Sequence, residues 1–108
     1  MDCIFCKIIK GEIPSKKVYE DENVLAFHDI NPRAKTHIVV IPKEHIESAA
    51  AIDAQNACAA ANVFTAIPKI ARELGLENYR IINNCGEGAG QTVFHIHFHL
   101  LGGDLRDF

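Results

Sequence analysis

The chain has 108 residues, of which 48% are hydrophobic and 23% are charged, and its formal net charge is −3 at pH 7. These values predict one small globular domain over residues 1–108, and the interspersed charges exclude the basic stripe that duplex nucleic acid requires. There is no uncharged apolar run of membrane-spanning length, and residues 1–14 lack the pattern of a secretory signal. We therefore expect a cytoplasmic protein without a membrane partner, whose four cysteines are thiols or metal ligands.

The first half of the chain predicts a short helix and three strands. Residues 3–10 are apolar and end before a glycine, which is typical of a short helix. Residues 17–30 contain two β-rich runs around the polar segment 21–23, which predicts a hairpin. Residues 37–42 are rich in isoleucine and valine and predict a buried strand that ends at Pro42.

The alanine-rich stretch 53–74 predicts the one long helix. Apolar side chains recur along it at helical spacing, and Gly75 stands where a C-terminal cap belongs. Pro68 lacks an N–H and crowds the carbonyl four residues earlier. We therefore expect a kink near residues 64–68, or a helix in two pieces.

Two further strands are predicted at residues 79–84 and 92–101, and the glycine-rich segment 85–91 joins them. Five strands with hairpin connections and one main helix predict an α+β fold. In this fold a five-stranded antiparallel sheet carries the long helix on one face, and the short helix precedes the sheet.

Three histidines, His95, His97 and His99, occupy alternate positions of the last predicted strand. Alternation places them on one face of that strand. The opposite face is wholly apolar and is expected to be the core side; it carries Phe94, Ile96, Phe98 and Leu100. Other polar residues would decorate a solvated face equally well, so three histidines indicate chemistry near neutral pH. From spacing alone, a catalytic zinc on all three histidines stays open beside a division of labour among them.

The glycines of the preceding loop suggest a ligand for these histidines. Gly86, Gly88 and Gly90 permit the backbone to turn its amides inward as an anion nest suited to phosphate. A plain hairpin connection explains this loop when it is taken alone. Beside three aligned histidines, we favour phosphate chemistry.

The stretch QTVFHIHFHLLGG resembles the signature of the histidine triad (HIT) family, His-φ-His-φ-His-φ-φ, where φ is apolar. Residues 3–32 and 36–46 are similar to the Hint branch of that family, the nucleoside phosphoramidases. The pair Gly102-Gly103 also looks like Hint, whereas the Fhit branch of dinucleoside polyphosphate hydrolases carries an arginine nearby. The resemblance covers almost the whole chain and implies a HIT-like fold.

This resemblance implies a purine nucleoside phosphoramidase that cleaves AMP–amine conjugates through a nucleotidyl-histidine. His97 would be the nucleophile and His99 would contact the phosphate oxygens. Thr92 stands where relatives often have serine and would help to protonate the leaving amine, and His37 matches a family histidine near the triad. The resemblance implies no cofactor for this chemistry.

The same matching implies a nucleotide site. Asp29 corresponds to the carboxylate that accepts the ribose hydroxyls. The apolar slot around the base would comprise Ile4, Phe5, Ile8, Phe27, Ile30 and Val39. The phosphate and ribose surroundings would be completed by Asn84, Gly90, Gln91, Thr92, Val93, His97 and His99.

Cys3 and Cys6 have a metal-ligand spacing, although two incidental buried thiols would give the same pattern. Some bacterial-type HIT proteins and the related galactose-1-phosphate uridylyltransferases have such a pair. By that likeness His45 and His95 complete a structural Cys₂His₂ zinc site. Cys58 and Cys85 receive no role.

Three alternatives stay open on the same residues: dinucleoside polyphosphate hydrolysis, nucleotidyl transfer, and nucleotide binding with vestigial turnover. The resemblance further implies a homodimer. Only five residues follow Gly103, fewer than in animal relatives, so the specificity for the leaving group stays undetermined.

Overall fold

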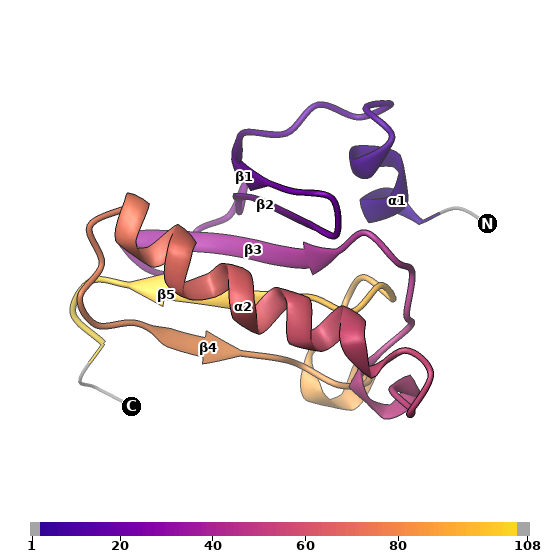
Figure 1. Ribbon diagram of the computed structural model, residues 1–108. Helices are drawn as coiled ribbons and strands as arrows, with labels where there is room; N and C mark the ends of the chain where they lie inside the picture. The colour runs from indigo at the N-terminus through magenta and orange to yellow at the C-terminus, as the bar shows by residue number, and fades with distance from the viewer. Residues whose placement is uncertain (1–2, 106–108) are drawn as a thin grey trace.

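The computed structural model describes residues 3–105, and Figure 1 shows a five-stranded antiparallel sheet with two α-helices packed beside it. In chain order the elements are α1 (Ile4–Ile9), β1 (Lys17–Glu20), β2 (Val24–His28), β3 (Thr36–Pro42), α2 (Ala57–Glu73), β4 (Arg80–Ile82) and β5 (Phe98–Gly102), with short 3₁₀ turns at Ala49–Ala51 and Glu87–Ala89. The strand order is β1-β2-β3-β5-β4, which confirms the predicted α+β fold. Among the described residues, no helix combines the length and apolarity needed to cross a membrane.

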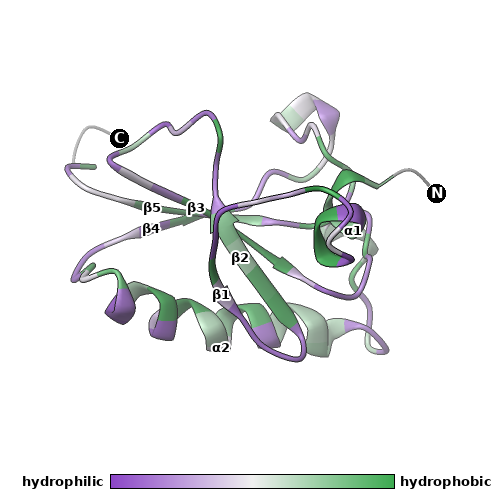
Figure 2. Ribbon diagram, turned by 90° about the horizontal axis from the view of Figure 1, so that it is seen from above, coloured by the Kyte–Doolittle hydropathy of each residue, from purple (hydrophilic) through white to green (hydrophobic). Residues whose placement is uncertain are grey.

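Both faces of the central strands are buried, and α1 and α2 lie on opposite sides of the sheet (Figure 2). On β2, Val24 and Ala26 pack with the apolar side of α2, whereas Leu25 and Phe27 pack with α1. This alternation has the period of two that a strand imposes on its side chains. His99 of β5, and His97 just before it, lie on the face of the sheet that carries α1.

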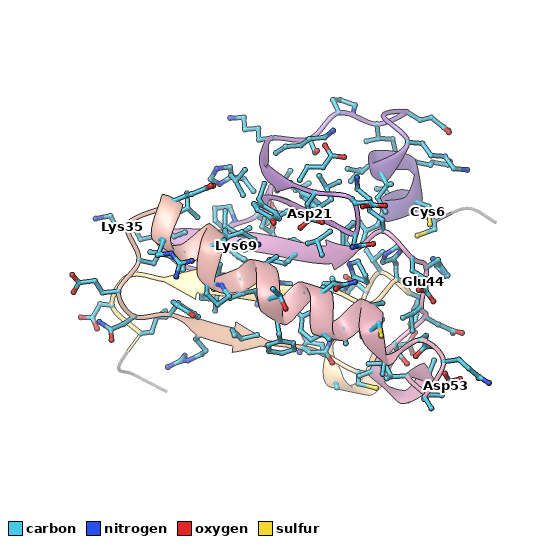
Figure 3. All side chains as sticks on the ribbon, viewed as in Figure 1. Cys6, Asp21, Lys35, Glu44, Asp53 and Lys69 are labelled. Atoms are coloured by element: carbon cyan, nitrogen blue, oxygen red, sulfur yellow. The ribbon has the colours of Figure 1, made fainter. Side chains whose placement is uncertain are left out.

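Helix α2 begins four residues later than predicted. The Asp53 carboxylate accepts hydrogen bonds from the N–H groups of Gln55 (2.8 Å) and Asn56 (3.1 Å) (Figure 3). These bonds stabilise a non-helical turn where the first helical turn was predicted. The helix then continues past Pro68 to Glu73. The expectation of two separate helical pieces is therefore wrong.

The end of α2 follows the prediction. Gly75 has φ +72°, and the N–H groups of Gly75 and Leu76 donate to the carbonyls of Arg72 and Ala71. This pattern is a Schellman motif, for which glycine is the favoured residue. The helix end directs the chain back along the sheet into β4.

Strand β5 starts at Phe98, six residues later than predicted. Its pairing with β3 ends at Val40↔Phe98, and beyond this point the Ile96 N–H donates instead to Ile46 O (2.6 Å). Strand alternation therefore does not extend to Phe94, whose side chain is 43% exposed and does not belong to the core. The expectation that Phe94 lies on the core face is wrong, while Ile96, Phe98 and Leu100 do lie there.

Candidate active site

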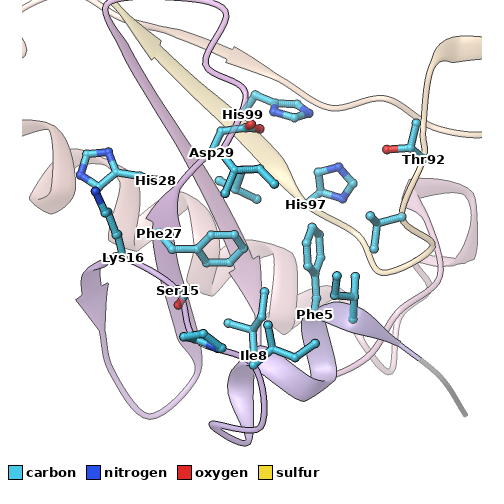
Figure 4. A pocket seen from close by; sticks show the side chains of 16 residues that line it. Phe5, Ile8, Ser15, Lys16, Phe27, His28, Asp29, Thr92, His97 and His99 are labelled. Atoms are coloured by element: carbon cyan, nitrogen blue, oxygen red, sulfur yellow. The ribbon is translucent and has the colours of Figure 1, made fainter.

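A cleft of about 950 Å³ opens on the α1 face of the sheet (Figure 4). Helix α1 forms one wall, β2 and β3 form the floor, and the triad segment forms the opposite wall. Most of the residues expected around a nucleotide line it, namely Ile4, Phe5, Ile8, Phe27, Asp29, Ile30, Val39, Thr92, Val93, His97 and His99. The lining also includes Ile13, Pro14, Ser15, Lys16 and His28, which the sequence did not single out.

His97 is buried, with 6% of its surface exposed, and its ring lies in the cleft beside Phe5 (Figure 4). Its Nδ1 lies 2.8 Å from the carbonyl oxygen of His95. Because a carbonyl can only accept, Nδ1 must carry the proton of this bond. In the neutral ring Nε2 then holds a free lone pair, which is the form that a nucleophile requires.

His99 is held in the opposite tautomer. The Arg33 N–H donates to Nδ1 of His37 (3.0 Å), so the proton of His37 is on Nε2. That Nε2 lies 2.9 Å from Nδ1 of His99, which accepts the bond. A neutral His99 therefore carries its own proton on Nε2 and can donate it to a ligand. Burial, followed by the charges of His97 and His37, lowers the pKa of His99 to about 4, which keeps the ring neutral at pH 7.

Asp29 stands beside this histidine pair at the end of β2. Its Oδ1 accepts the Asn31 N–H at 2.7 Å, and its Oδ2 lies 3.5 Å from Nε2 of His37. The potential ligand atoms of Asp29, His37 and His99 all lie within 4.8 Å of one another. They do not suit a metal ion, because the Arg33 N–H already uses the Nδ1 lone pair of His37 and leaves a proton on Nε2. Arg33, His37 and His99 instead form a hydrogen-bond chain, and the Asp29 carboxylate lies beside it at the lining of the cleft.

A second cluster, Cys3, Cys6, His45 and His95, could hold a metal ion. His95 is fully buried, and its Nε2 lies 2.8 Å from the Pro42 carbonyl, so this nitrogen donates and Nδ1 is left as a ligand atom. Nδ1 of His95 is 3.4 Å from Cys3 Sγ, 3.6 Å from Cys6 Sγ and 3.1 Å from Nδ1 of His45. A tetrahedral zinc with bonds of about 2.0–2.3 Å separates its ligand atoms by roughly 3.3–3.8 Å. The cluster is therefore close to the size that such an ion requires.

The chemistry of the donors supports the same use. The Cys6 N–H donates to Cys3 Sγ (3.3 Å), which leaves Cys3 as an acceptor. Burial, followed by the hydrogen bond and charge of Cys3, raises the pKa of the Cys6 thiol. The raised pKa favours the protonated thiol while no cation is near. Ligation requires both cysteines as thiolates, and a bound metal would supply the positive charge that two neighbouring thiolates need. His95 is thus turned away from the cleft and toward the cysteines, which separates its role from that of His97.

The glycine-rich loop does not line the cleft. The N–H groups of Ala89, Gly90 and Gln91 donate to carbonyls within the loop, and that of Gly86 donates to the Gln91 side chain. These four N–H groups are therefore not free to form the predicted anion nest. The Asn84 amide also bonds within the loop, to Ala89 O (2.9 Å). Among the predicted nucleotide residues, the structure leaves Asn84, Gly90 and Gln91 outside the cleft.

Gln91 has a structural position instead. It is 2% exposed, and its amide donates to Glu47 O (2.8 Å) and Val93 O (3.0 Å). These bonds fix the backbone on both sides of Thr92.

Asn83 was missed in favour of its neighbour Asn84. Its amide donates to the carbonyl of His97 at 2.9 Å and so fixes the backbone of that residue. Continued past Ile82↔His99, the antiparallel register would place Asn83 opposite Phe98 and Asn84 opposite His97. Strand pairing alone therefore does not single out Asn83, and only the folded chain shows its bond to the His97 carbonyl.

The comparisons with known proteins agree with this geometry. The HIT domain model matches residues 10–105. The chain belongs to the HIT family. Protein hit from Bacillus subtilis is 51% identical over 104 residues, which cover 93% of this chain and 70% of that protein. An uncharacterised HIT-like protein from Methanocaldococcus jannaschii is 50% identical over 99 residues, which cover 92% of this chain and 77% of the relative.

Two solved structures show the same fold over nearly the whole chain. A histidine triad protein from Clostridium difficile has a TM-score of 0.95 and 50% identity, with 100% of this chain and 96% of that chain covered. A HIT family hydrolase from Legionella pneumophila has a TM-score of 0.94 and 44% identity, covering 99% and 97%. The HIT-like fold expected from the triad is therefore confirmed, and the pair Cys3 and Cys6 is compatible with the bacterial Hint-type branch.

Proposed function

We propose that this HIT protein is a hydrolase that cleaves the P–N bond of purine nucleoside phosphoramidates, in which AMP is linked to an amine. The observation that carries the proposal is the tautomer of His97. Its bond to the His95 carbonyl directs the lone pair of Nε2 away from the backbone in a residue that lines the cleft. An imidazole fixed in this way can attack phosphorus without a separate base.

The reaction has two displacements. In the first, the Nε2 lone pair of His97 forms a bond to the α-phosphorus, and the P–N bond breaks with its electron pair on the leaving nitrogen. That nitrogen takes up a proton, through the Thr92 hydroxyl or from water, and departs as the amine. In the second, a water oxygen attacks phosphorus, the P–Nε2 bond breaks, and the water's proton is lost to solvent. The products are AMP, the free amine and His97 in its original state.

The other residues of the cleft support these steps. His99 carries its proton on Nε2 and donates a hydrogen bond through it to a phosphoryl oxygen, where negative charge builds up. Asp29 keeps one carboxylate oxygen available for the ribose hydroxyls. Phe5, Phe27 and Ile8 supply the apolar walls that a purine ring requires.

The intermediate provides the decisive test. Mixing the protein with an adenosine phosphoramidate should produce a transient mass increase of one adenylate, which is absent in His97→Ala. We expect His97→Ala to lower the turnover by at least about 10²- to 10⁴-fold. A protein that binds AMP without adduct or turnover would contradict the proposal and favour a binding role. Faster cleavage of a dinucleoside polyphosphate than of the phosphoramidate would assign the site to that reaction instead.

We further propose that the cluster of Cys3, Cys6, His45 and His95 holds a structural zinc ion and that catalysis does not require it. Its donor set and the spacing of its ligand atoms support zinc. Two metal-binding thiolates also suit a reducing compartment such as the cytoplasm. We also propose that the protein forms a homodimer, and size-exclusion chromatography with light scattering tests this oligomeric state.

A further inference from the structure

A second groove of about 450 Å³ lies next to the catalytic cleft. It is lined by Cys3, Ile4, His45, Glu47, Thr92, Val93 and Phe94. Ile4, Thr92 and Val93 also line the larger cleft, so the two hollows meet at these side chains. A ligand that fills the cleft can therefore extend past Thr92 into the groove.

The walls of the groove combine apolar surface with one negative charge. Phe94 is 43% exposed and Ile4 is 46% exposed, so both offer apolar surface to a ligand in the groove. Glu47 supplies an exposed carboxylate, and none of the lining residues is lysine or arginine. The Gln91 amide donates hydrogen bonds to the carbonyls of Glu47 and Val93, which lie on the two walls of the groove. These bonds hold the two walls at a fixed separation.

We propose that this groove is the subsite for the leaving amine and that it selects amines with an apolar body and a second positive charge. The inference rests on the proposed phosphoramidase activity. With the nucleoside in the larger cleft and Thr92 beside the breaking P–N bond, the amine lies on the side of Thr92 where the groove opens. The amine's carbon chain packs on Phe94 and Ile4, and its distal ammonium group faces Glu47.

In this proposal the exposed Phe94 side chain binds the carbon chain of the amine. Its side chain stands outside the core because β5 begins only at Phe98, and it is placed two residues from Thr92. An apolar side chain so positioned gains contact area when a substrate covers it. An anionic amine should be rejected because its carboxylate would face Glu47.

Three AMP phosphoramidates whose amines share a five-carbon chain test the proposal: conjugates of 1,5-diaminopentane, n-pentylamine and 5-aminopentanoate, with the methylamine conjugate as reference. We expect kcat/KM to fall in the order cationic, neutral, anionic, with about threefold to fivefold between the first two, as for a partly exposed ion pair. Glu47→Gln should bring the cationic-to-neutral ratio close to one. Glu44→Gln removes a neighbouring exposed carboxylate that does not line the groove, and it should leave the ratio unchanged.

Phe94 is tested with the neutral probe. Phe94→Ala should lower kcat/KM for n-pentylamine relative to methylamine by about fivefold to tenfold, since several methylene groups lose their contact. Phe94→Leu should restore most of that ratio, which separates lost contact from disturbed folding. Equal losses with both substrates would overturn the subsite.

Binding separates this proposal from the proposed activity. The affinities of the three probes are measured by calorimetry with His97→Ala, which cannot form the intermediate. If wild-type protein hydrolyses no probe while the affinities still follow the charge order and depend on Glu47, the activity is wrong and the subsite stands. Equal affinities for the three probes, a charge preference that survives Glu47→Gln, or no binding of any probe would overturn the subsite.

Discussion

His97 and His99 are bonded to the protein through the same ring atom, Nδ1, but in opposite directions. Nδ1 of His97 donates to a carbonyl, whereas Nδ1 of His99 accepts from His37. The first arrangement leaves a lone pair on Nε2 and the second leaves a proton there. Two histidines at neighbouring alternate positions thus present a lone pair and a proton at Nε2, the forms that the proposed nucleophile and the proposed phosphate contact require, and the difference arises from their hydrogen-bond partners.

His37 is therefore expected to act through His99. In His37→Ala the His99 ring loses its partner and can adopt either tautomer. We expect kcat/KM for an adenosine phosphoramidate to fall roughly 10- to 100-fold, as for other residues that orient a histidine through its second nitrogen. His37→Gln places an amide N–H within reach of His99 and should recover part of the loss. Stopped-flow measurement of adduct formation checks this, and equal losses in the two variants would contradict it.

The lowered pKa of His99 has a consequence for stability. The unfolded chain takes up a proton at His99 below about pH 6.5, whereas the native state does so only near the pKa of about 4. The unfolded state therefore binds more protons between these values, and the free energy of unfolding should decrease as the pH falls from 6.5 to 4. Above pH 6.5 this contribution is constant.

Urea unfolding of wild type and His99→Gln at pH 7 and pH 4.5 isolates the effect, because other acid-sensitive groups are common to both proteins. Between pH 7 and pH 4.5 we expect the free energy of unfolding to fall by on the order of 1–2 kcal/mol more in the wild type than in the variant. This is less than the full pKa shift of His99 implies, because solvent screens a half-buried ring. An equal loss in both proteins would show that His99 ionises normally.

At the scale of the elements, β5 and the end of α2 meet at Gly102. A Cβ added there would lie 2.5 Å from Cδ2 and 3.1 Å from Cδ1 of Leu76. Because these atoms are the end of a half-buried side chain that can shift, we expect Gly102→Ala to cost about 1 kcal/mol, the lower end for overpacked sites. Leu76→Ala should relieve the clash, so the double variant should be more stable than the sum of the single losses predicts. Gly88→Ala meets no atom within 4 Å and is the control, expected to change stability by less than about 0.5 kcal/mol.

Local patterns predicted the elements well where a strand has partners on both sides. The β-rich run of β2 and the isoleucine and valine run of β3 were sufficient to identify these two strands, both of which are buried, and Gly75 correctly indicated a helix end. The same reasoning failed for residues 92–97 because the pairing between β3 and β5 ends at Val40↔Phe98. The bond from Ile96 N–H to Ile46 O replaces the ladder, and no local pattern reveals it.

The site was predictable by residue type but not by proton position. The spacing of the histidines and the family signature indicated which side chains to examine, and most of them line one cleft. Their tautomers depend on backbone groups of Arg33, Pro42 and His95, which only the folded chain brings into place. The side chain of Asn84 donates to a carbonyl of its own loop, whereas that of Gln91 donates to Glu47 O, which is distant in sequence, so neither partner could be predicted from the local pattern.

For the whole molecule, the cluster of cysteines and histidines connects parts of the chain that are distant in sequence. Cys3 precedes α1 and Cys6 belongs to it, His45 follows β3, and His95 lies two residues before His97. Figure 3 shows Cys6 at α1, facing the loop that carries Glu44. Helix α1 also supplies a wall of the cleft, so a metal at this cluster would fix that wall against the triad segment.

Loss of the metal should therefore weaken nucleotide binding more than the chemical step. We expect about one zinc per chain in wild type, with less than about 0.2 per chain contradicting the site. In Cys6→Ser, zinc should be absent and Tm should fall by on the order of 10 °C. KM for the phosphoramidate should rise severalfold while kcat changes little, because His97 and His99 keep their own hydrogen bonds. Cys58→Ser, at an exposed position on α2, should retain zinc, Tm and KM. A fall in kcat at unchanged KM would instead mean that the ion acts on the triad segment itself, through the shared backbone of His95 and His97.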